Sequence, residues 1–185
     1  MMVDELEKLF EYANQNFIKN NRTLFEIGVS ERTLCGALMH ELCLALDAFG
    51  YKGYYADIEY NRHVGMIRTH RKTVEGPKNE EMIINTDIIV HGRGSKPERE
   101  NLIALEMKKS SARNKDKRND RNRIKSLTRA AGEYEYIEKM DKYVFGYELG
   151  IYYEVNLKKR NVQAEFYRDG EAYDEKTYDL RNKEC

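Results

Sequence analysis

The stretch TDIIVHGRGSKPERENLIALEMKKS, residues 86–110, joins two strongly apolar runs through a polar segment that contains glycine and proline. The runs IIV and LIALEM are typical of buried strands, and the composition of GRGSKPEREN is typical of a turn. A short antiparallel hairpin is therefore predicted. Within it, Asp87, Glu106 and Lys108 stand where a buried strand ordinarily carries Val or Ile, so their charges need a physical explanation.

The hairpin register brings two of these charges together. Side chains alternate across a strand, so Glu106 and Lys108 point to the same face. If the pairing is centred between Lys96 and Pro97, paired residue numbers sum to 193 and Asp87 lies directly opposite Glu106. At a Cβ separation of about 5 Å, two carboxylates repel each other unless a cation lies between them. Hard oxygen ligands suit Mg²⁺ or Mn²⁺, so Asp87 and Glu106 are predicted to bind such an ion.

Lys108 would stand beside this metal, where an ammonium group can orient a water or offset negative charge in a phosphoryl transition state. Because a metal ion lowers the pKa of its bound water, no serine or histidine nucleophile is needed. The predicted chemistry is hydrolysis of a phosphodiester through a metal-bound water. The alternative is an edge strand whose charged face is simply solvated and whose charges discourage aggregation.

These residues resemble the motif of the PD-(D/E)XK nucleases, which have the restriction-endonuclease-like fold. The match consists of Asp87 in TDIIV and of Glu106-Met107-Lys108, the only E-x-K triplet in the chain. The resemblance implies an α/β (α+β) protein whose αβββαβ core has a mixed central sheet flanked by helices. It also implies that Asp87 and Glu106 bind the metal and that Lys108 assists the attacking water.

The family also uses an acid from the helix before the first strand. Glu31 lies at the centre of the apolar stripe of that helix and is the expected residue, while Glu41 on the stripe's edge and Glu59 in the first strand are the alternatives. The sequence departs from the family pattern in two places. Thr86 replaces the proline, and residues 112–140 contain no glutamine, which leaves the branch of the family unassigned.

Hydrophobic periodicity predicts the other elements of one domain over residues 1–185, with an N-terminal helical extension at 1–28, a core at 31–168 and a polar tail at 170–185. Ser30 is a good N-cap for the second helix. The predicted helices span 3–19, 31–49 and the later part of 108–132, strands fall near 54–62, 143–155 and 162–168, and residues 68–81 form a loop or a long hairpin tip.

Composition narrows the protein class. The chain has 185 residues, 32 basic and 32 acidic side chains and three cysteines, which predicts a globular protein without a disulfide framework. No stretch reaches the apolar length that a bilayer requires, and no signal-peptide core is present. A cytoplasmic protein without a membrane partner is expected.

The basic residues are concentrated after the hairpin. Residues 108–129 hold ten Lys or Arg against two Asp, a local net charge of +8, so this segment is predicted to follow a nucleic-acid backbone. By the resemblance, DNA rather than RNA is the expected nucleic acid. A solvated helix face is the alternative.

Because cutting both strands of a duplex commonly uses paired sites, a homodimer is also considered. A second hypothesis is a catalytically inactive nuclease-like scaffold that binds nucleic acid or a protein. The candidate DNA-binding residues are Lys109, Arg113, Lys115, Lys117, Arg118, Arg121, Arg123 and Lys125.

Overall fold

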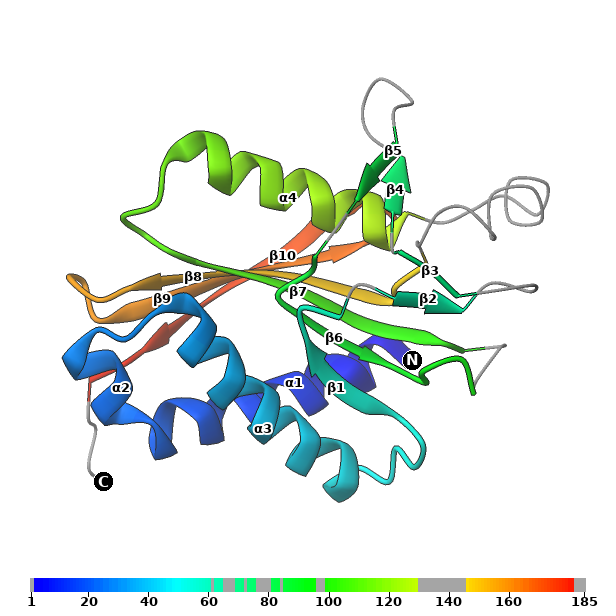
Figure 1. Cartoon of the computed structure of the whole chain (residues 1–185). Coiled ribbons are helices and arrows are strands. Elements are labelled where there is room, and N and C mark those ends of the chain that lie inside the picture. The colour runs from blue at the N-terminus through cyan, green and yellow to red at the C-terminus, as the bar shows by residue number, and fades with distance from the viewer. Residues whose placement is uncertain are drawn as a thin grey trace.

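The computed structural model describes residues 2–60, 62–64, 69–71, 73–75, 81–83, 85–95, 99–129 and 146–181. Its centre is a six-stranded mixed sheet with the strand order β1-β6-β7-β8-β9-β10 (Figure 1). All neighbouring strands are antiparallel except β7 and β8, which are parallel. The strands are β1 (Tyr55–Ile58), β6 (Ile88–His91), β7 (Asn101–Lys109), β8 (Leu149–Asn156), β9 (Asn161–Arg168) and β10 (Glu171–Asp179).

The predicted hairpin forms between β6 and β7, and its register is the predicted one. Ile88 pairs with Leu105 and Val90 with Ile103, so the paired numbers sum to 193. A register shift follows at His91, which pairs with Asn101. The predicted tip at residues 96–98 lies outside the described residues. Because the register holds at the far end of the hairpin, Asp87 is brought beside Glu106 and Met107.

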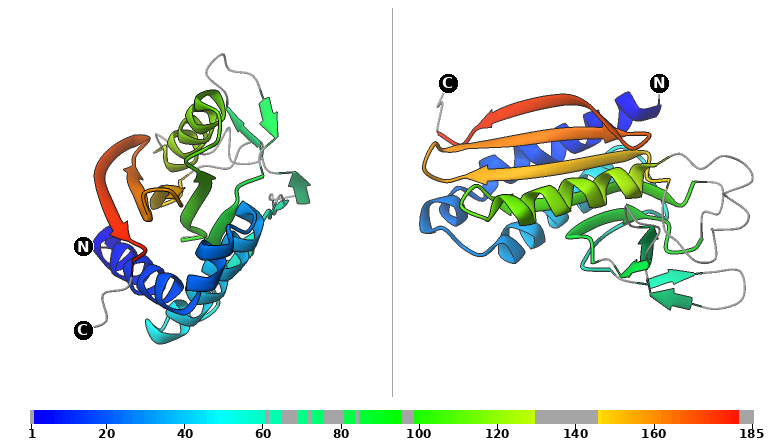
Figure 2. Two further views of the ribbon diagram at one scale, coloured as in Figure 1. Left: turned by 90° about the vertical axis from the view of Figure 1, so that its left-hand side faces the viewer. Right: turned by 90° about the horizontal axis from the view of Figure 1, so that it is seen from above.

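Helices cover both faces of the sheet. The helices α1 (Met2–Asn20), α2 (Arg22–Ile27) and α3 (Glu31–Ala48) lie on one face, and α4 (Asn114–Thr128) lies on the other (Figures 1 and 2). The predicted N-cap is confirmed, since Ser30 Oγ accepts a hydrogen bond from the Thr33 N–H. The short helix α2 was not predicted. A large apolar core fills the space between α1, α3 and the sheet, and a smaller one lies under α4.

Helix α4 begins earlier than the sequence predicts. The polar segment from Asn114 onward is helical rather than a loop. Arg113 has the extended backbone of an N-cap residue, and its side chain pairs with Asp116 in the first turn. The helix is held to the sheet by a narrow apolar stripe, because Ile124 and Leu127 are fully buried against the sheet. The polar residues of α4 therefore lie mainly on its outer face, and only a few apolar residues pack against the sheet.

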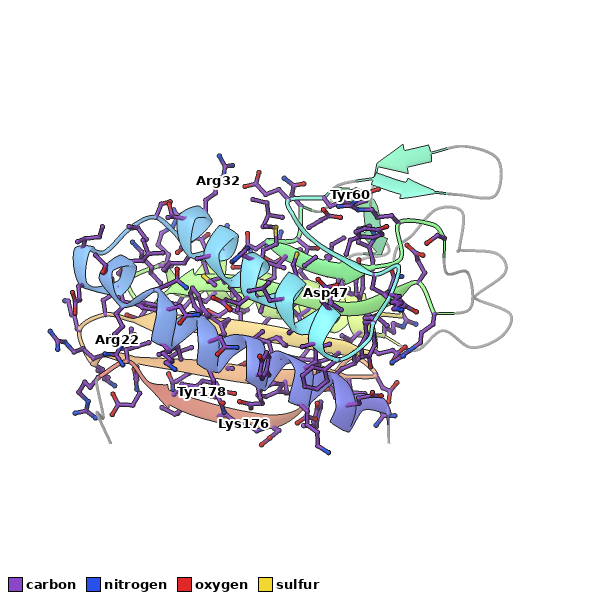
Figure 3. The ribbon with its side chains drawn as sticks, turned by 90° about the horizontal axis from the view of Figure 1, so that it is seen from below. Arg22, Arg32, Asp47, Tyr60, Lys176 and Tyr178 are labelled. Carbon is purple, nitrogen blue, oxygen red and sulfur yellow. The ribbon has the colours of Figure 1, made fainter. Side chains whose placement is uncertain are left out.

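Two segments that were predicted without strands contain them. The polar tail beyond Gly170 forms β10, which pairs with β9 along most of its length. Figure 3 shows Lys176 and Tyr178 of this strand beside α1, and Tyr178 donates a hydrogen bond to Glu11 of that helix. The polar region after β1 contains two small antiparallel pairs: β2 (Arg62–Val64) with β3 (Thr69–Arg71), and β4 (Thr73–Glu75) with β5 (Glu81–Ile83).

Cys35 and Cys43 of α3 are both free thiols. In the part of the chain that the structure describes, no helix combines the length and the apolar character needed to cross a bilayer.

Gly150 of β8 fixes the approach of α4 to the sheet. A Cβ at this position would lie 2.6 Å from Cγ2 of Ile124 and 2.6 Å from Cγ2 of Thr128. We expect Gly150→Ala to destabilise the fold by about 1–3 kcal/mol because α4 must shift outward. For a chain of this size the thermal midpoint should fall by about 2–4 °C per kcal/mol.

The matched control for this substitution is Gly36→Ala in α3, where an added Cβ meets nothing within 4 Å. Alanine in a helix interior is favoured over glycine by roughly 0.5–1 kcal/mol, so this variant should be slightly more stable than the native protein. Thermal unfolding followed by circular dichroism compares the two. A Gly150→Ala midpoint equal to that of Gly36→Ala would contradict the close contact.

Candidate functional site

Four charged side chains that the sequence analysis selected lie together at the end of β7. Glu31 opens α3, Asp87 precedes β6, and Glu106 and Lys108 lie in β7. The Lys108 ammonium nitrogen lies 3.6 Å from Glu31 Oε2 and 3.9 Å from Asp87 Oδ2. Residues distant in sequence are thus combined in one cluster of charge.

Backbone hydrogen bonds hold two of the carboxylates in place. Strand β6 begins at Ile88, so β7 extends past it and its N–H groups need other acceptors. Asp87 Oδ2 accepts from the Met107 N–H at 2.8 Å, and Glu31 Oε1 accepts from the Lys109 N–H at 2.8 Å. Each carboxylate therefore accepts a hydrogen bond that a neighbouring strand would otherwise accept. These bonds to β7 fix the positions of the two carboxylates.

Glu106 lies deeper than its neighbours. Glu106 is 1% exposed, and its side chain lies on the sheet face that α4 covers. Its Oε1 lies 2.7 Å from Arg123 Nε, yet neither atom has a partner with hydrogen-bond geometry. The contact is thus an ion pair set by proximity rather than by a well-directed bond. A buried carboxylate oxygen without a directed partner is costly unless a cation supplies the missing interaction.

Helix α4 adds two residues that the sequence analysis did not place in the catalytic set. Asp120 is 3% exposed, and its Oδ2 lies 3.2 Å from Lys108 Nζ. Arg123, three residues later, donates from its Nη2 to Asp120 Oδ1. The sequence did hold a signal for Asp120: it is four residues before Ile124 and seven before Leu127, so it shares their inward face. Arg123 was predicted to bind DNA, whereas its side chain contacts the acidic cluster.

The cluster carries an excess of negative charge. Its four carboxylates (Glu31, Asp87, Glu106 and Asp120) face two cationic side chains (Lys108 and Arg123). With every group ionised, two negative charges are left, which one divalent cation would balance.

The pKa shifts reflect this excess. Burial, followed by the negative charge of Asp87, raises the pKa of Glu106 well above its usual range, although Arg123 acts in the opposite direction. Burial also raises the pKa of Asp87, against the Met107 N–H and Lys108. Burial alone would lower the pKa of Lys108, but the surrounding carboxylates outweigh it and raise that pKa. Protons on the acids and a metal ion would thus relieve the same repulsion.

The residues present fit a hard divalent cation held by few protein ligands. Asp87 and Glu106 offer adjacent carboxylate oxygens, and Mg²⁺ is commonly bound through one or two carboxylates together with water and substrate phosphate. Within the described ranges, no three His, Cys, Asp or Glu side chains form a metal-binding group. Asp87 and Glu106 could thus supply two carboxylate ligands to Mg²⁺ or Mn²⁺.

Glu106 should make the stability of the fold depend on pH. Because its pKa is higher in the folded than in the unfolded protein, the folded state binds more protons, and stability falls as pH rises above about 4.5. Glu106→Gln removes the contribution of Glu106 to this pH dependence. We expect the variant to lose less stability between about pH 5 and about pH 8, and to unfold several degrees above the native protein at the upper end.

Thermal unfolding in EDTA across this pH range measures the effect without bound metal. The control is Glu175→Gln, which changes an exposed carboxylate of β10. Parallel pH profiles for native protein and Glu106→Gln would show that Glu106 is not the group responsible.

The structure divides the predicted DNA-binding residues into paired and outward groups. Lys117 contacts Glu154 at 2.9 Å, and Arg121 contacts Glu165 at 2.6 Å while lying over the ring of Tyr152. These pairs attach α4 to β8 and β9. Lys109 Nζ donates to Gly28 O, Lys125 pairs with the exposed Glu171, and Arg123 contacts the acidic cluster. The exposed members are Lys115, Arg118 and Arg113, of which Arg113 also pairs with Asp116 in the first turn of α4.

The alternative acids do not reach the cluster. Glu41 is buried and accepts a hydrogen bond from Asn20 Nδ2 at 3.0 Å. Glu59 pairs with Arg32 at 2.6 Å, and Figure 3 shows Arg32 projecting outward from α3. Glu31 is therefore the residue that lies at the site from the helix before β1. Its contact with Lys108 involves Oε2, because Oε1 is already used by the Lys109 N–H.

Comparison with known proteins returned no significant match among protein-family models, curated proteins or solved structures.

Proposed function

We propose that the protein is a metal-dependent nuclease that hydrolyses DNA phosphodiester bonds with Mg²⁺ or Mn²⁺. The observation that carries this proposal is the meeting of Asp87, Glu106 and Lys108 on one face at the end of β7, with Lys108 Nζ 3.9 Å from Asp87 Oδ2. A charged edge strand that was merely solvated would not bury Glu106 to 1% exposure.

The topology supports a restriction-endonuclease-like core. The elements α3, β1, β6, β7, α4 and β8 follow the αβββαβ order that the resemblance implies. Three strands are antiparallel neighbours, and the fourth, β8, is parallel to β7 after the α4 crossover. The small pairs β2–β3 and β4–β5 would then be insertions between the first two core strands, and α1, β9 and β10 additions around the core.

Each residue of the cluster has a role in this proposal. Asp87 and Glu106 would hold the metal, which when bound supplies Lewis acidity and lowers the pKa of a coordinated water. Lys108 would orient the attacking water or offset the charge that develops on the phosphate. Glu31 and Asp120, at 3.6 Å and 3.2 Å from the Lys108 ammonium, would keep that side chain aimed at the site. Their carboxylates also keep Lys108 protonated, so it would act as a cation.

The exposed basic residues Arg113, Lys115 and Arg118 are the best candidates for backbone contacts with DNA. They lie in or just before the first half of α4, whose inner face contributes Asp120 and Arg123 to the cluster. A phosphate backbone that followed this outer surface would pass close to the site, and binding would weaken with salt. The preference for DNA over RNA rests on the family resemblance.

The proposal is tested by incubating the purified protein with labelled single-stranded and duplex DNA in Mg²⁺, Mn²⁺ or EDTA. Cleavage with either metal and none in EDTA supports the nuclease. Salt-sensitive binding without cleavage under any condition supports the second hypothesis, an inactive scaffold that binds nucleic acid. Neither binding nor cleavage would contradict the nuclease and a scaffold that binds nucleic acid, and would favour the other form of the second hypothesis, a scaffold that binds a protein.

A further inference from the structure

We infer that Arg123 is a built-in counter-cation of the site, which a divalent metal displaces from Glu106 while Asp120 keeps hold of it. The inference rests on the proposed function, because it concerns the same metal site. It identifies α4 as the element that sets the metal affinity, in addition to the strand residues that would hold the ion.

The competition follows from which atoms Arg123 contacts. Its Nε lies 2.7 Å from Glu106 Oε1, on the carboxylate that would bind the metal. A divalent cation and a guanidinium cannot both occupy that oxygen at short range, since like charges in a poorly solvated site repel strongly. Binding of the metal therefore requires the Arg123 contact with Glu106 to open.

Arg123 makes two contacts with carboxylates, and only the one to Asp120 is a hydrogen bond, which indicates that the contact with Glu106 opens. Its Nη2 donates a hydrogen bond to Asp120 Oδ1, three residues earlier on the same helix. Its Nε, in contrast, faces Glu106 without hydrogen-bond geometry. The guanidinium can thus turn away from Glu106 while keeping its directed bond to Asp120.

The Arg123 side chain is partly exposed, so it can move toward solvent. It is 24% exposed, whereas the side chain of Glu106 is 1% exposed, so the arginine reaches the surface and the glutamate does not. After displacement, its planar donors would face solvent near Lys108, where they could contact a substrate phosphate. Arg121 is not a comparable candidate, because both oxygens of Glu165 accept hydrogen bonds from it.

The test is calorimetric titration of Mn²⁺ into metal-stripped protein, without nucleic acid. Arg123→Gln removes the competing charge and should bind Mn²⁺ at least about tenfold more tightly, since one nearby charge commonly changes the affinity of a carboxylate for a proton by one to three orders of magnitude. Arg168→Gln is the matched control: its side chain is 57% exposed and contacts only the neighbouring Asp169 among the ion pairs of the described residues. It should bind as the native protein does.

A second measurement follows the native protein during the metal titration and needs a variant only to assign one signal. The Arg123 Nε–H signal in proton–nitrogen correlation spectra is assigned by its loss in Arg123→Lys and is then followed during Mg²⁺ titration. We expect it to shift with metal saturation while the Arg121 signal stays in place. An Arg123 signal unchanged at saturation would overturn the inference.

The outcomes separate this inference from the proposed function. If the native protein binds Mn²⁺ and Arg123→Gln binds no more tightly, displacement of Arg123 is excluded and the metal site stands. If neither protein binds Mn²⁺, the two carboxylates do not hold a cation without substrate and the inference fails, while the cleavage assay in Mg²⁺, Mn²⁺ or EDTA still decides the proposed nuclease. Binding by Arg123→Gln alone would support strong competition by Arg123.

Discussion

Glu106→Gln is expected to lower metal-dependent DNA cleavage by about a thousandfold or more, which corresponds to about 4 kcal/mol of lost transition-state stabilisation. The amide keeps the shape of the side chain but removes the charge that would hold the cation. Burial and repulsion by Asp87 both disfavour the charged form of Glu106. The variant, which lacks this charge, should therefore fold at least as stably as the native protein. Loss of activity and retention of stability would occur together.

This combination distinguishes a functional carboxylate from a structural one. The cleavage rate and the thermal midpoint are measured on the same preparations, with Glu175→Gln as the control for loss of one exposed carboxylate. Cleavage by Glu106→Gln at the native rate would exclude a role in metal binding. A large fall in stability would instead assign Glu106 a structural role as the partner of Arg123.

Lys108→Met is expected to separate turnover from metal binding. The substitution keeps much of the aliphatic stem and removes the ammonium, so the cleavage rate should fall by roughly a hundredfold to a thousandfold. Metal affinity should be unchanged or higher, because a positive charge 3.9 Å from Asp87 is lost. Comparison of single-turnover rates at saturating Mg²⁺ with calorimetric affinities measures the two effects separately.

Lys158→Met is the control, since Lys158 is exposed in the turn between β8 and β9 and lies outside both the cluster and α4. It should change neither quantity. Native cleavage rates for Lys108→Met would remove Lys108 from the proposed mechanism. Equal losses of rate and metal affinity would mean that the ammonium acts through the structure of the site.

The part of the site that the sequence predicted is the part set by local periodicity. Strand alternation and a fixed hairpin register are enough to place Asp87 beside Glu106 and to orient Lys108 to the same face. Helical periodicity likewise favoured Glu31 over Glu41, and the structure has Glu31 at the cluster. These inferences needed only short stretches of chain.

The rest depended on contacts between distant segments. The apolar spacing of Ile124 and Leu127 puts Asp120 on the inward face of α4, but Asp120 joins the acidic cluster only because α4 packs across β7 and β8, which no short stretch of sequence shows. Similarly, Arg121 pairs with Glu165 and Lys117 pairs with Glu154, both on strands that follow the helix in sequence. Strand β10 has little hydrophobic alternation because it is a sheet edge, held by β9 and by hydrogen bonds from Tyr173 and Tyr178 to α1.

The most direct measurement is calorimetric titration of Mn²⁺ into the native protein, Asp87→Asn, Glu106→Gln and the double variant. If the two carboxylates hold one cation, the native protein binds at a single site. Each single substitution then weakens binding by at least about tenfold, which is about 1.4 kcal/mol, and the double variant loses less than the sum of the two losses. Equal affinity in all four proteins would contradict a metal site at Asp87 and Glu106.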